Sequence, residues 1–272
     1  MKLPLVAVRL GILAIKLIAL MIIILSILPL MNGGIDVNFD TANDSDWSYT
    51  STSLSLDSPL TVTNNGFYDI NDLTIGFTFL GEDGEVLAES TSDSMDIPAG
   101  KETELRVRMT LDLDDLTQNV LSDIVFNGTR MEFVVEVSAK YSMDLVRISV
   151  EGGTDLSWQP MLSNLDIMNE YSRLMSDGSN HSLSIPYTFY AQDLIQGQPV
   201  MVLTQFSDSH GYMTNLTQVI DARDNVYEEA VVPITQEVYD RMTSGPEELT
   251  VSVTLVFLGC SNTVTETWGW SS

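Results

Sequence analysis

The sequence is poor in cysteine, histidine and basic residues. Its 272 residues include one Cys, two His and 12 Lys+Arg against 38 Asp+Glu, which gives a formal net charge of -26 at pH 7. A single Cys excludes a disulfide scaffold and a zinc site built from several thiolates. So acidic a chain also lacks the basic surface that binding to nucleic-acid phosphates requires.

The shortage of histidine also bears on catalysis. Only His181 and His210 could supply the imidazole of a hydrolase. His181 lies inside a glycosylation sequon, and His210 lies in a Gly-containing turn that favours a solvated hairpin tip. Cys260 follows an apolar strand and is expected to be a small core residue. With no nucleophile and base in view, we expect no enzyme and no cofactor.

What the chain does contain is 44% hydrophobic residues, which excludes a disordered protein despite the charge. The acidic residues form local groups, but no twelve-residue EF-hand loop is present, so we expect a hydrated acidic surface and no metal site. These groups are Asp40, Asn43, Asp44 and Asp46, then Glu82, Asp83 and Glu85, then Asp112, Asp114 and Asp115.

Charge is unevenly distributed along the chain. Lys2, Arg9 and Lys16 precede any acidic residue, and from Asp36 onward 9 basic residues face 38 acidic ones. Between these regions lies an apolar segment, residues 10–31, whose length as a helix is about 33 Å against a hydrocarbon core of about 30 Å. We therefore expect a transmembrane anchor in contact with the bilayer, with a cytoplasmic N-terminus and the remaining chain outside the cell.

The alternative to an anchor is a cleaved signal peptide. Residues 17–31 lie at the upper end of the length range for such a peptide, but the following residues 30–34 lack the small-residue cleavage pattern. The anchor is the favoured interpretation, and either one exports the rest of the chain. Export agrees with four candidate N-glycosylation acceptors, Asn43, Asn127, Asn180 and Asn215. The scarcity of Cys favours a prokaryotic, and specifically an archaeal, cell envelope.

The exported part contains an internal repeat. Residues 55–86 align without gaps to residues 182–213, and later landmarks such as Trp158 and Trp268 follow in the same order. The aligned identities comprise Ser55/Ser182, Leu56/Leu183, Pro59/Pro186, Thr61/Thr188, Phe79/Phe206 and Gly84/Gly211. We infer two copies of one fold.

Each copy shows the period-2 alternation of β-strands. Residues 74–80, 105–113 and 131–139 alternate apolar and polar side chains, and Asp83-Gly84 predicts a hairpin turn. A short helix is expected between two late strands of each copy, at 114–124 and 235–242. The predicted class is all-β, with two tandem immunoglobulin or fibronectin-III-like sandwiches after the anchor.

These patterns predict four segments. They are a cytoplasmic stub and anchor (1–35), a first sandwich (36–160), a linker with a short helix (161–179) and a second sandwich (180–272). The linker helix rests on Leu165, Met168, Tyr171 and Leu174, which lie roughly at helical spacing.

Two motifs in the first copy resemble a known family. Val62-Thr63-Asn64-Asn65-Gly66 and Ile97-Pro98-Ala99-Gly100-Lys101 resemble the opening strand and mid-domain turn of late-embryogenesis-abundant type 2 (water-stress/hypersensitive-response) domains. Adhesion-type Ig-like domains have nearly the same spacing, and both alternatives stay open. The resemblance covers residues 54–158 and implies a non-enzymatic β-sandwich. The second copy departs from it, with Ala191-Gln192-Asp193 and Asp221-Ala222-Arg223 at the two motifs.

Together these features predict a membrane-anchored structural or adhesive protein. Its sandwiches would bind another envelope protein or a surface polymer through sheet edges and loops. The alternative is a binding module that accepts a small apolar ligand or lipid between its sheets.

Overall fold

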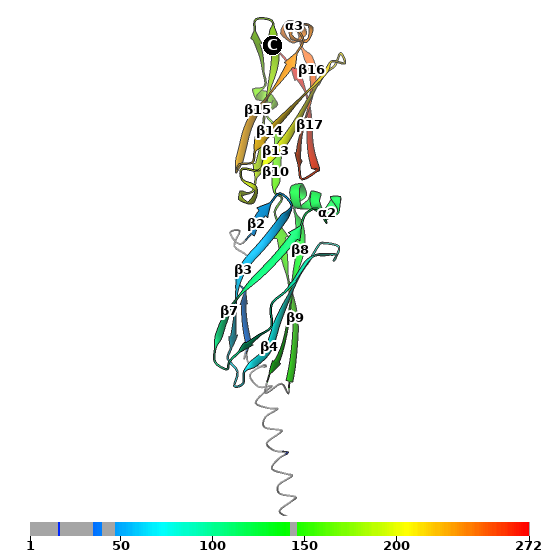
Figure 1. Ribbon diagram of the computed structural model, residues 1–272. Helices are drawn as coiled ribbons and strands as arrows, with labels where there is room; N and C mark the ends of the chain where they lie inside the picture. The colour runs from blue at the N-terminus through cyan, green and yellow to red at the C-terminus, as the bar shows by residue number, and fades with distance from the viewer. Residues whose placement is uncertain (1–15, 17–34, 40–46, 142–145, 272) are drawn as a thin grey trace, which may run out of the picture. The chain divides into compact units, whose positions relative to one another are not determined.

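The described residues form mainly β-strands, as predicted from their period-2 patterns. The computed structural model describes residue 16 and residues 35–39, 47–141 and 146–271. The chain divides into two compact units, one formed by 1–112 with 131–156 and the other by 113–130 with 157–272. Figure 1 shows the strands of each unit as two layers of arrows.

The first unit contains two sheets. In one sheet, strand β3 (Ser53–Asn64) pairs with β1, β2 and β7. In the other, β4 (Ile70–Leu80) pairs with β5, β6 and β8, and β8 also pairs with β9. The remaining bounds are β1 (Ile35–Phe39), β2 (Trp47–Thr50), β5 (Val86–Thr91), β6 (Met95–Ile97), β7 (Glu102–Asp112), β8 (Thr129–Tyr141) and β9 (Val146–Trp158).

The second unit repeats this plan. Strand β12 (Asn180–Ala191) pairs with β10, β11 and β15, and the other sheet has the order β14-β13-β16-β17. The remaining strands are β10 (Leu162–Ile167), β11 (Arg173–Asp177), β13 (Pro199–Asp208), β14 (Met213–Asp221), β15 (Asn225–Ile234), β16 (Glu247–Phe257) and β17 (Cys260–Trp270). The helices are α2 (Gln118–Ser122), the π-helical η2 (Asp123–Asn127), the 3-10 turns η3 (Asn169–Tyr171) and η4 (Asp193–Ile195), and α3 (Gln236–Ser244).

The pairing plan agrees with the sequence repeat. Strands β3, β4 and β8 occupy the same places in the first unit as β12, β13 and β16 in the second. A helix follows the partner strand of β3 or β12 in each copy, namely α2 after β7 and α3 after β15. Both copies therefore have the connectivity of a two-sheet sandwich.

Alternation along each strand produces the cores. In β3 every second residue from Leu54 is buried, and in β13 the buried residues alternate with exposed ones from Val200 to Phe206. Each fully buried aliphatic or aromatic side chain contributes about 1.5–3 kcal/mol to folding. A shift of register by one residue would turn these side chains to solvent, so the burial pattern fixes the register.

The predicted transmembrane anchor is corrected by the structure. In the described ranges α2 has five residues and α3 nine, about 8 and 14 Å of helix. None of the helices described is long and apolar enough to span a bilayer. The cell-membrane location and the orientation that were inferred from residues 10–31 are corrected together with the anchor, and the contact with the bilayer stays a prediction. Apart from Lys16, which is exposed, that range lies outside the described residues, as do Lys2 and Arg9.

The segment expected to be a helical linker contributes strands to the second unit. Residues 161–179 contain β10 and β11, which both pair with β12. Met161, Leu162 and Ile167 are its buried apolar residues, while Tyr171 is 57% exposed. The helical spacing of the apolar residues was therefore misleading, because burial here follows pairing with β12.

The second unit also includes residues 113–130, which lie between β7 and β8 in sequence. Ile124 is fully buried, and its carbonyl accepts hydrogen bonds from the Trp158 Nε1 (3.1 Å) and from the Met161 amide (3.2 Å). The Gln118 side chain donates to the Gly259 carbonyl in the β16–β17 turn at 3.4 Å. These contacts show how a segment from the first copy completes the second unit.

Candidate functional site

The outer surface of sheet β14-β13-β16-β17 differs from the rest of this acidic protein. Alternate residues of its four strands point away from the core, and between the two ends of the sheet none of them is charged. Asp221 lies at one end and Glu248 at the other. We call this surface the neutral face. It comprises Met201, Leu203, Gln205 and Ser207 of β13, Met213, Asn215, Thr217 and Val219 of β14, Thr250, Ser252, Thr254 and Val256 of β16, and Ser261, Thr263, Thr265 and Thr267 of β17.

One part of the neutral face is apolar. Met201 lies opposite Val219 on β14 and opposite Val256 on β16. Val219 is 68% exposed, and Met201 and Leu203 are each 38% exposed. Protein surfaces in general expose single apolar residues, but a group of neighbouring apolar residues indicates an interaction surface.

The other part consists of paired hydroxyl groups. Thr250 and Thr267 are 2.9 Å apart at their oxygens, and the pairs Ser252–Thr265 and Thr254–Thr263 are each 2.8 Å apart. Each of these hydroxyl groups therefore already has one hydrogen-bond partner on the neighbouring strand. The result is a polar but uncharged surface that is cheaper to desolvate than a charged one.

The corresponding sheet of the first unit is charged. On β8, which occupies the place of β16, the outward positions include the exposed Glu132 and Glu136 and the half-buried Lys140. Lys140 pairs with Asp72 at 2.6 Å, and this hydrogen bond lowers the pKa of Asp72. The lack of charge is therefore a property of one sheet and does not follow from the shared fold.

The candidate glycosylation acceptors are exposed where the structure describes them. Asn127 ends the π-helical η2, Asn180 begins β12 and Asn215 lies on the neutral face. Asn43 lies outside the described residues. Glycosylation stays a prediction, and a glycan on Asn215 would cover part of the neutral face.

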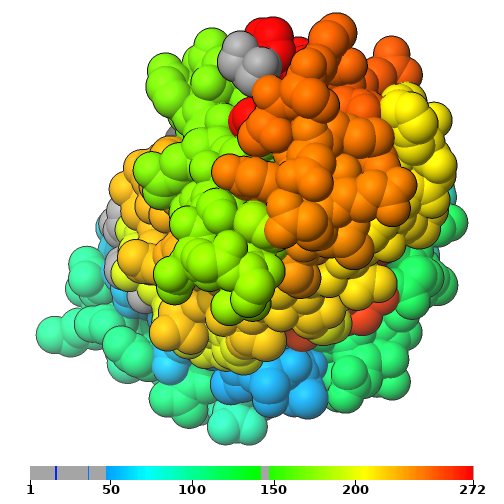
Figure 2. Space-filling view, turned by 90° about the horizontal axis from the view of Figure 1, so that it is seen from above, coloured from blue at the N-terminus to red at the C-terminus, as the bar shows by residue number. Residues whose placement is uncertain are grey.

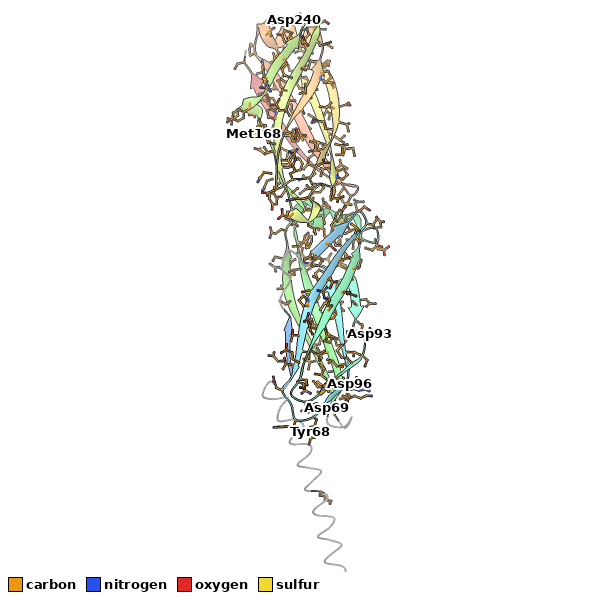
Figure 3. All side chains as sticks on the ribbon, turned by 60° about the vertical axis from the view of Figure 1, so that its left-hand side comes forward. Tyr68, Asp69, Asp93, Asp96, Met168 and Asp240 are labelled. Atoms are coloured by element: carbon orange, nitrogen blue, oxygen red, sulfur yellow. The ribbon has the colours of Figure 1, made fainter. Side chains whose placement is uncertain are left out.

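The two family motifs of the first unit are bonded to each other through Asn64. This residue is fully buried, and its Nδ2 donates to the carbonyls of Tyr68 (2.9 Å) and Ile97 (3.0 Å) while its Oδ1 accepts from the Gly66 amide (3.0 Å). The Tyr141 hydroxyl accepts from the amide of Tyr68 at 3.3 Å. Figure 3 labels Tyr68 beside Asp69 and Asp96 at one end of this unit. The motifs therefore hold these loops together.

A charged cluster joins α3 to the β13–β14 turn at one end of the second unit. Figure 2 shows that end, with α3 in orange beside the green start of β12. Arg241 of α3 forms ion pairs with Asp208, Glu237 and Glu247. The carboxylates of Asp208 and Glu247 are 1% and 7% exposed, so the guanidinium compensates two buried charges. His210 lies 3.3 Å from Glu247 and is 58% exposed. This cluster stabilises the β13–β14 turn against α3.

His181 and Cys260, whose side chains could react or bind a metal, are both held in contacts within the second unit. His181 is buried, stacks on Tyr239 at 4.2 Å and places its Nε2 2.6 Å from the Gln236 Oε1. Cys260 is buried with its Sγ 2.9 Å from the Gln118 Nε2, and burial raises the pKa of its thiol. Within the described ranges no His, Cys, Asp and Glu side chains gather as a metal site would require.

Comparisons with known proteins identify no family. No family model matches the chain, and no curated protein matches it. Among solved structures, the chain is similar to red sea bream transglutaminase with 12% identity and a TM-score of 0.36, covering 85% of this chain and 31% of the other. It is also similar to the YadV chaperone (11% identity, TM-score 0.28, 86% and 100% covered). A third similar structure is a tetra-tandem repeat from the extending region of a large adhesion protein (15% identity, TM-score 0.27, 86% and 48% covered).

These TM-scores are too low to support an argument about function. The chain spans less than a third of the length of the transglutaminase.

The neutral face is the feature that sequence reasoning missed. Its signal is present in residues 263–267, where Thr occupies every second position, and in the absence of charge at alternate positions of residues 201–207, 213–219 and 250–256. Such a pattern becomes visible once the four strands are known to be neighbours in one sheet.

Proposed function

We propose that this chain is a structural or adhesive protein whose neutral face binds a partner surface. The family alternatives that agree with this role are the adhesion-type Ig-like domain and the late-embryogenesis-abundant type 2 domain. The partner class that we propose is an envelope protein or a surface polymer. The observation that supports the proposal is a charge-free sheet surface on a chain with a formal net charge of -26.

The physical reason is the cost of desolvation. Binding removes water from both surfaces, and an unpaired charge buried in the process costs several kcal/mol. The neutral face avoids this cost, and its apolar part around Met201, Leu203 and Val219 gains about 25 cal/mol for each Å² that leaves water. A rigid sheet also loses little conformational entropy on binding.

The proposal can be tested by co-sedimentation with isolated envelopes of the cells that produce the protein. The test variant carries Leu203→Glu and Val219→Glu, and the control carries Val86→Glu and Val150→Glu. Each pair adds two negative charges at exposed apolar positions, in the second and first unit respectively. We expect binding of the test variant to fall at least tenfold and that of the control to stay within twofold of the wild type. Equal binding by both variants would contradict the proposal.

No specific observation favours the alternative of an apolar ligand between the sheets. Inward side chains of both sheets of the second unit, such as Ile185 on β12 and Val202 and Phe206 on β13, are fully buried in its core. That alternative stays a prediction from the sequence.

A further inference from the structure

The charge of the chain restricts what can approach the neutral face. From residue 161 onward, 3 basic residues face 14 acidic ones, so the surroundings of this face are negative. Another acidic molecule is repelled by most of this surface, and the repulsion is weakest where charge is absent. A second copy of this chain meets this condition when it presents the same face, because both contacting surfaces are then uncharged.

The apolar and hydroxyl groups of the neutral face can also pair with the same groups on a second copy. A two-fold axis that runs parallel to the face, in the plane between the two copies, brings the apolar part of one copy onto the same surface of the other, as in the isologous interfaces of most homodimers. Its hydroxyl groups both donate and accept, so Thr and Ser can pair with Thr and Ser across such an interface. A purely acidic or purely basic surface could not pair with itself in this way.

Strand β14 extends this surface to the edge of the sheet. Within the part of the chain that the structure describes, β14 pairs with β13 alone. Its nine residues, Met213–Asp221, contain one charged side chain, at the very end. Natural edge strands are usually protected by Lys, Pro or an inward-pointing charge. This edge has no such protection before Asp221, so it does not hinder a neighbouring copy.

The area of the neutral face determines how strongly two copies are expected to associate. Four strands about 4.8 Å apart, each contributing outward residues over about 20 Å, cover roughly 400 Å² in plan. A standard interface buries about 800 Å² per partner, and smaller ones belong to transient complexes. The interaction should therefore be reversible and concentration-dependent.

We propose that the neutral face binds the neutral face of a second copy, so that the adhesion mediated by this protein is homotypic. This inference rests on the proposed function and names the partner of the same site. It also makes a distinctive prediction about salt. Screening shortens the Debye length from about 10 Å at 0.1 M to about 3 Å at 1 M ionic strength. Salt should therefore strengthen an association that brings two acidic molecules together.

The test is sedimentation equilibrium of the purified, unglycosylated full chain at concentrations from 1 to about 100 µM, the range expected for transient complexes. We expect reversible dimers whose association constant rises at least threefold between 0.1 M and 1 M NaCl. Leu203→Glu with Val219→Glu should weaken association at least tenfold, whereas Val86→Glu with Val150→Glu should leave it unchanged. Circular dichroism of each variant verifies that the fold is retained.

A charge-swap experiment makes the assignment specific. The variant with Leu203→Lys and Val219→Lys should also remain monomeric alone, since like charges then meet across the two-fold axis. Mixing it with the Glu variant should restore dimers, because opposite charges meet. Recovery in the mixture requires that the same face of both copies is in contact.

The inference is overturned if the wild type is monomeric at 100 µM in both salts, or if the face variants associate as it does. These outcomes are separable from failure of the proposed function. A monomeric protein whose binding to envelopes is still lost in the Glu variant would retain the adhesive role and exclude a second copy as the partner. Loss of neither property in the variant would overturn both.

Discussion

Replacing Asn64 by Ala should destabilise the first unit and leave the second unchanged. The fully buried Asn64 side chain makes three hydrogen bonds, to Tyr68, Ile97 and Gly66, with lengths of 2.9 to 3.0 Å. Each contributes about 1 kcal/mol net, and two carbonyls and one amide lose a partner, so the free energy of unfolding should fall by about 3 kcal/mol. For a unit of about a hundred residues, this corresponds to a decrease in Tm of roughly 10 °C.

Differential scanning calorimetry is the appropriate assay, because two units can unfold in separate transitions. Asn64→Ala should lower one transition, and Asn119→Ala, which removes an exposed Asn in α2, should change neither by more than about 1 °C. Asn64→Asp is a second variant that keeps the shape of the side chain but removes the donor to both carbonyls. If Asn64→Ala behaves like Asn119→Ala, the hydrogen bonds do not hold the loops as argued.

Three further predictions concern the second unit. Ile124→Ala should cost about 2–5 kcal/mol and lower the transition of the second unit in calorimetry, because Ile124 is fully buried there although it precedes β8 in sequence; an effect on the other transition would contradict the division of the chain. Arg241→Ala should lower the free energy of unfolding measured in urea, since it leaves the buried carboxylates of Asp208 and Glu247 without their cation, and its effect should exceed that of Arg223→Ala, which breaks an exposed pair. The hydrogen bond from Ser184 (2.6 Å), together with Arg173, lowers the pKa of Glu229 from its ordinary 4.5. The contribution of ionised Glu229 to stability is therefore full above about pH 4.5 and is lost as the pH falls through the pKa of the folded state. Glu229→Gln should reduce the loss of stability that urea unfolding measures between pH 6 and pH 3.

The sequence predicts the strands well because burial in a two-sheet fold follows a period of two. Leu54, Leu56, Leu60 and Val62 alternate in sequence and are all buried in β3. The repeat also predicts the correspondence between β3 and β12, since Ser55 and Ser182 both lie in those strands. Local patterns are sufficient where the local period and the tertiary burial agree.

Other features depend on contacts between distant segments. Leu165 and Leu174 suggest a helix by spacing, but pairing of their segment with β12 forms strands instead. The assignment of residues 113–130 to the second unit rests on hydrogen bonds such as that from Trp158 to Ile124, 34 positions apart. No local pattern contains such information.

The candidate site also depends on contacts between segments that are distant in sequence. Asn127, Asn180 and Asn215 could be identified from a three-residue motif, and they are exposed. The neutral face involves four strands spread over residues 201–267, so its lack of charge is visible only after the strand order β14-β13-β16-β17 is known. The sequence indicated an acidic surface, and the structure identifies the exception to it.

The most direct test of the central claim is hydrogen–deuterium exchange of the wild-type chain, measured by mass spectrometry with and without isolated envelopes. The account predicts slower exchange in peptides from β13 and β14 on binding, with β7 and β8 of the first unit unchanged. Protection confined to the first unit, or no protection in β13 and β14 at concentrations where the protein is bound, would contradict the claim that the neutral face is the binding surface.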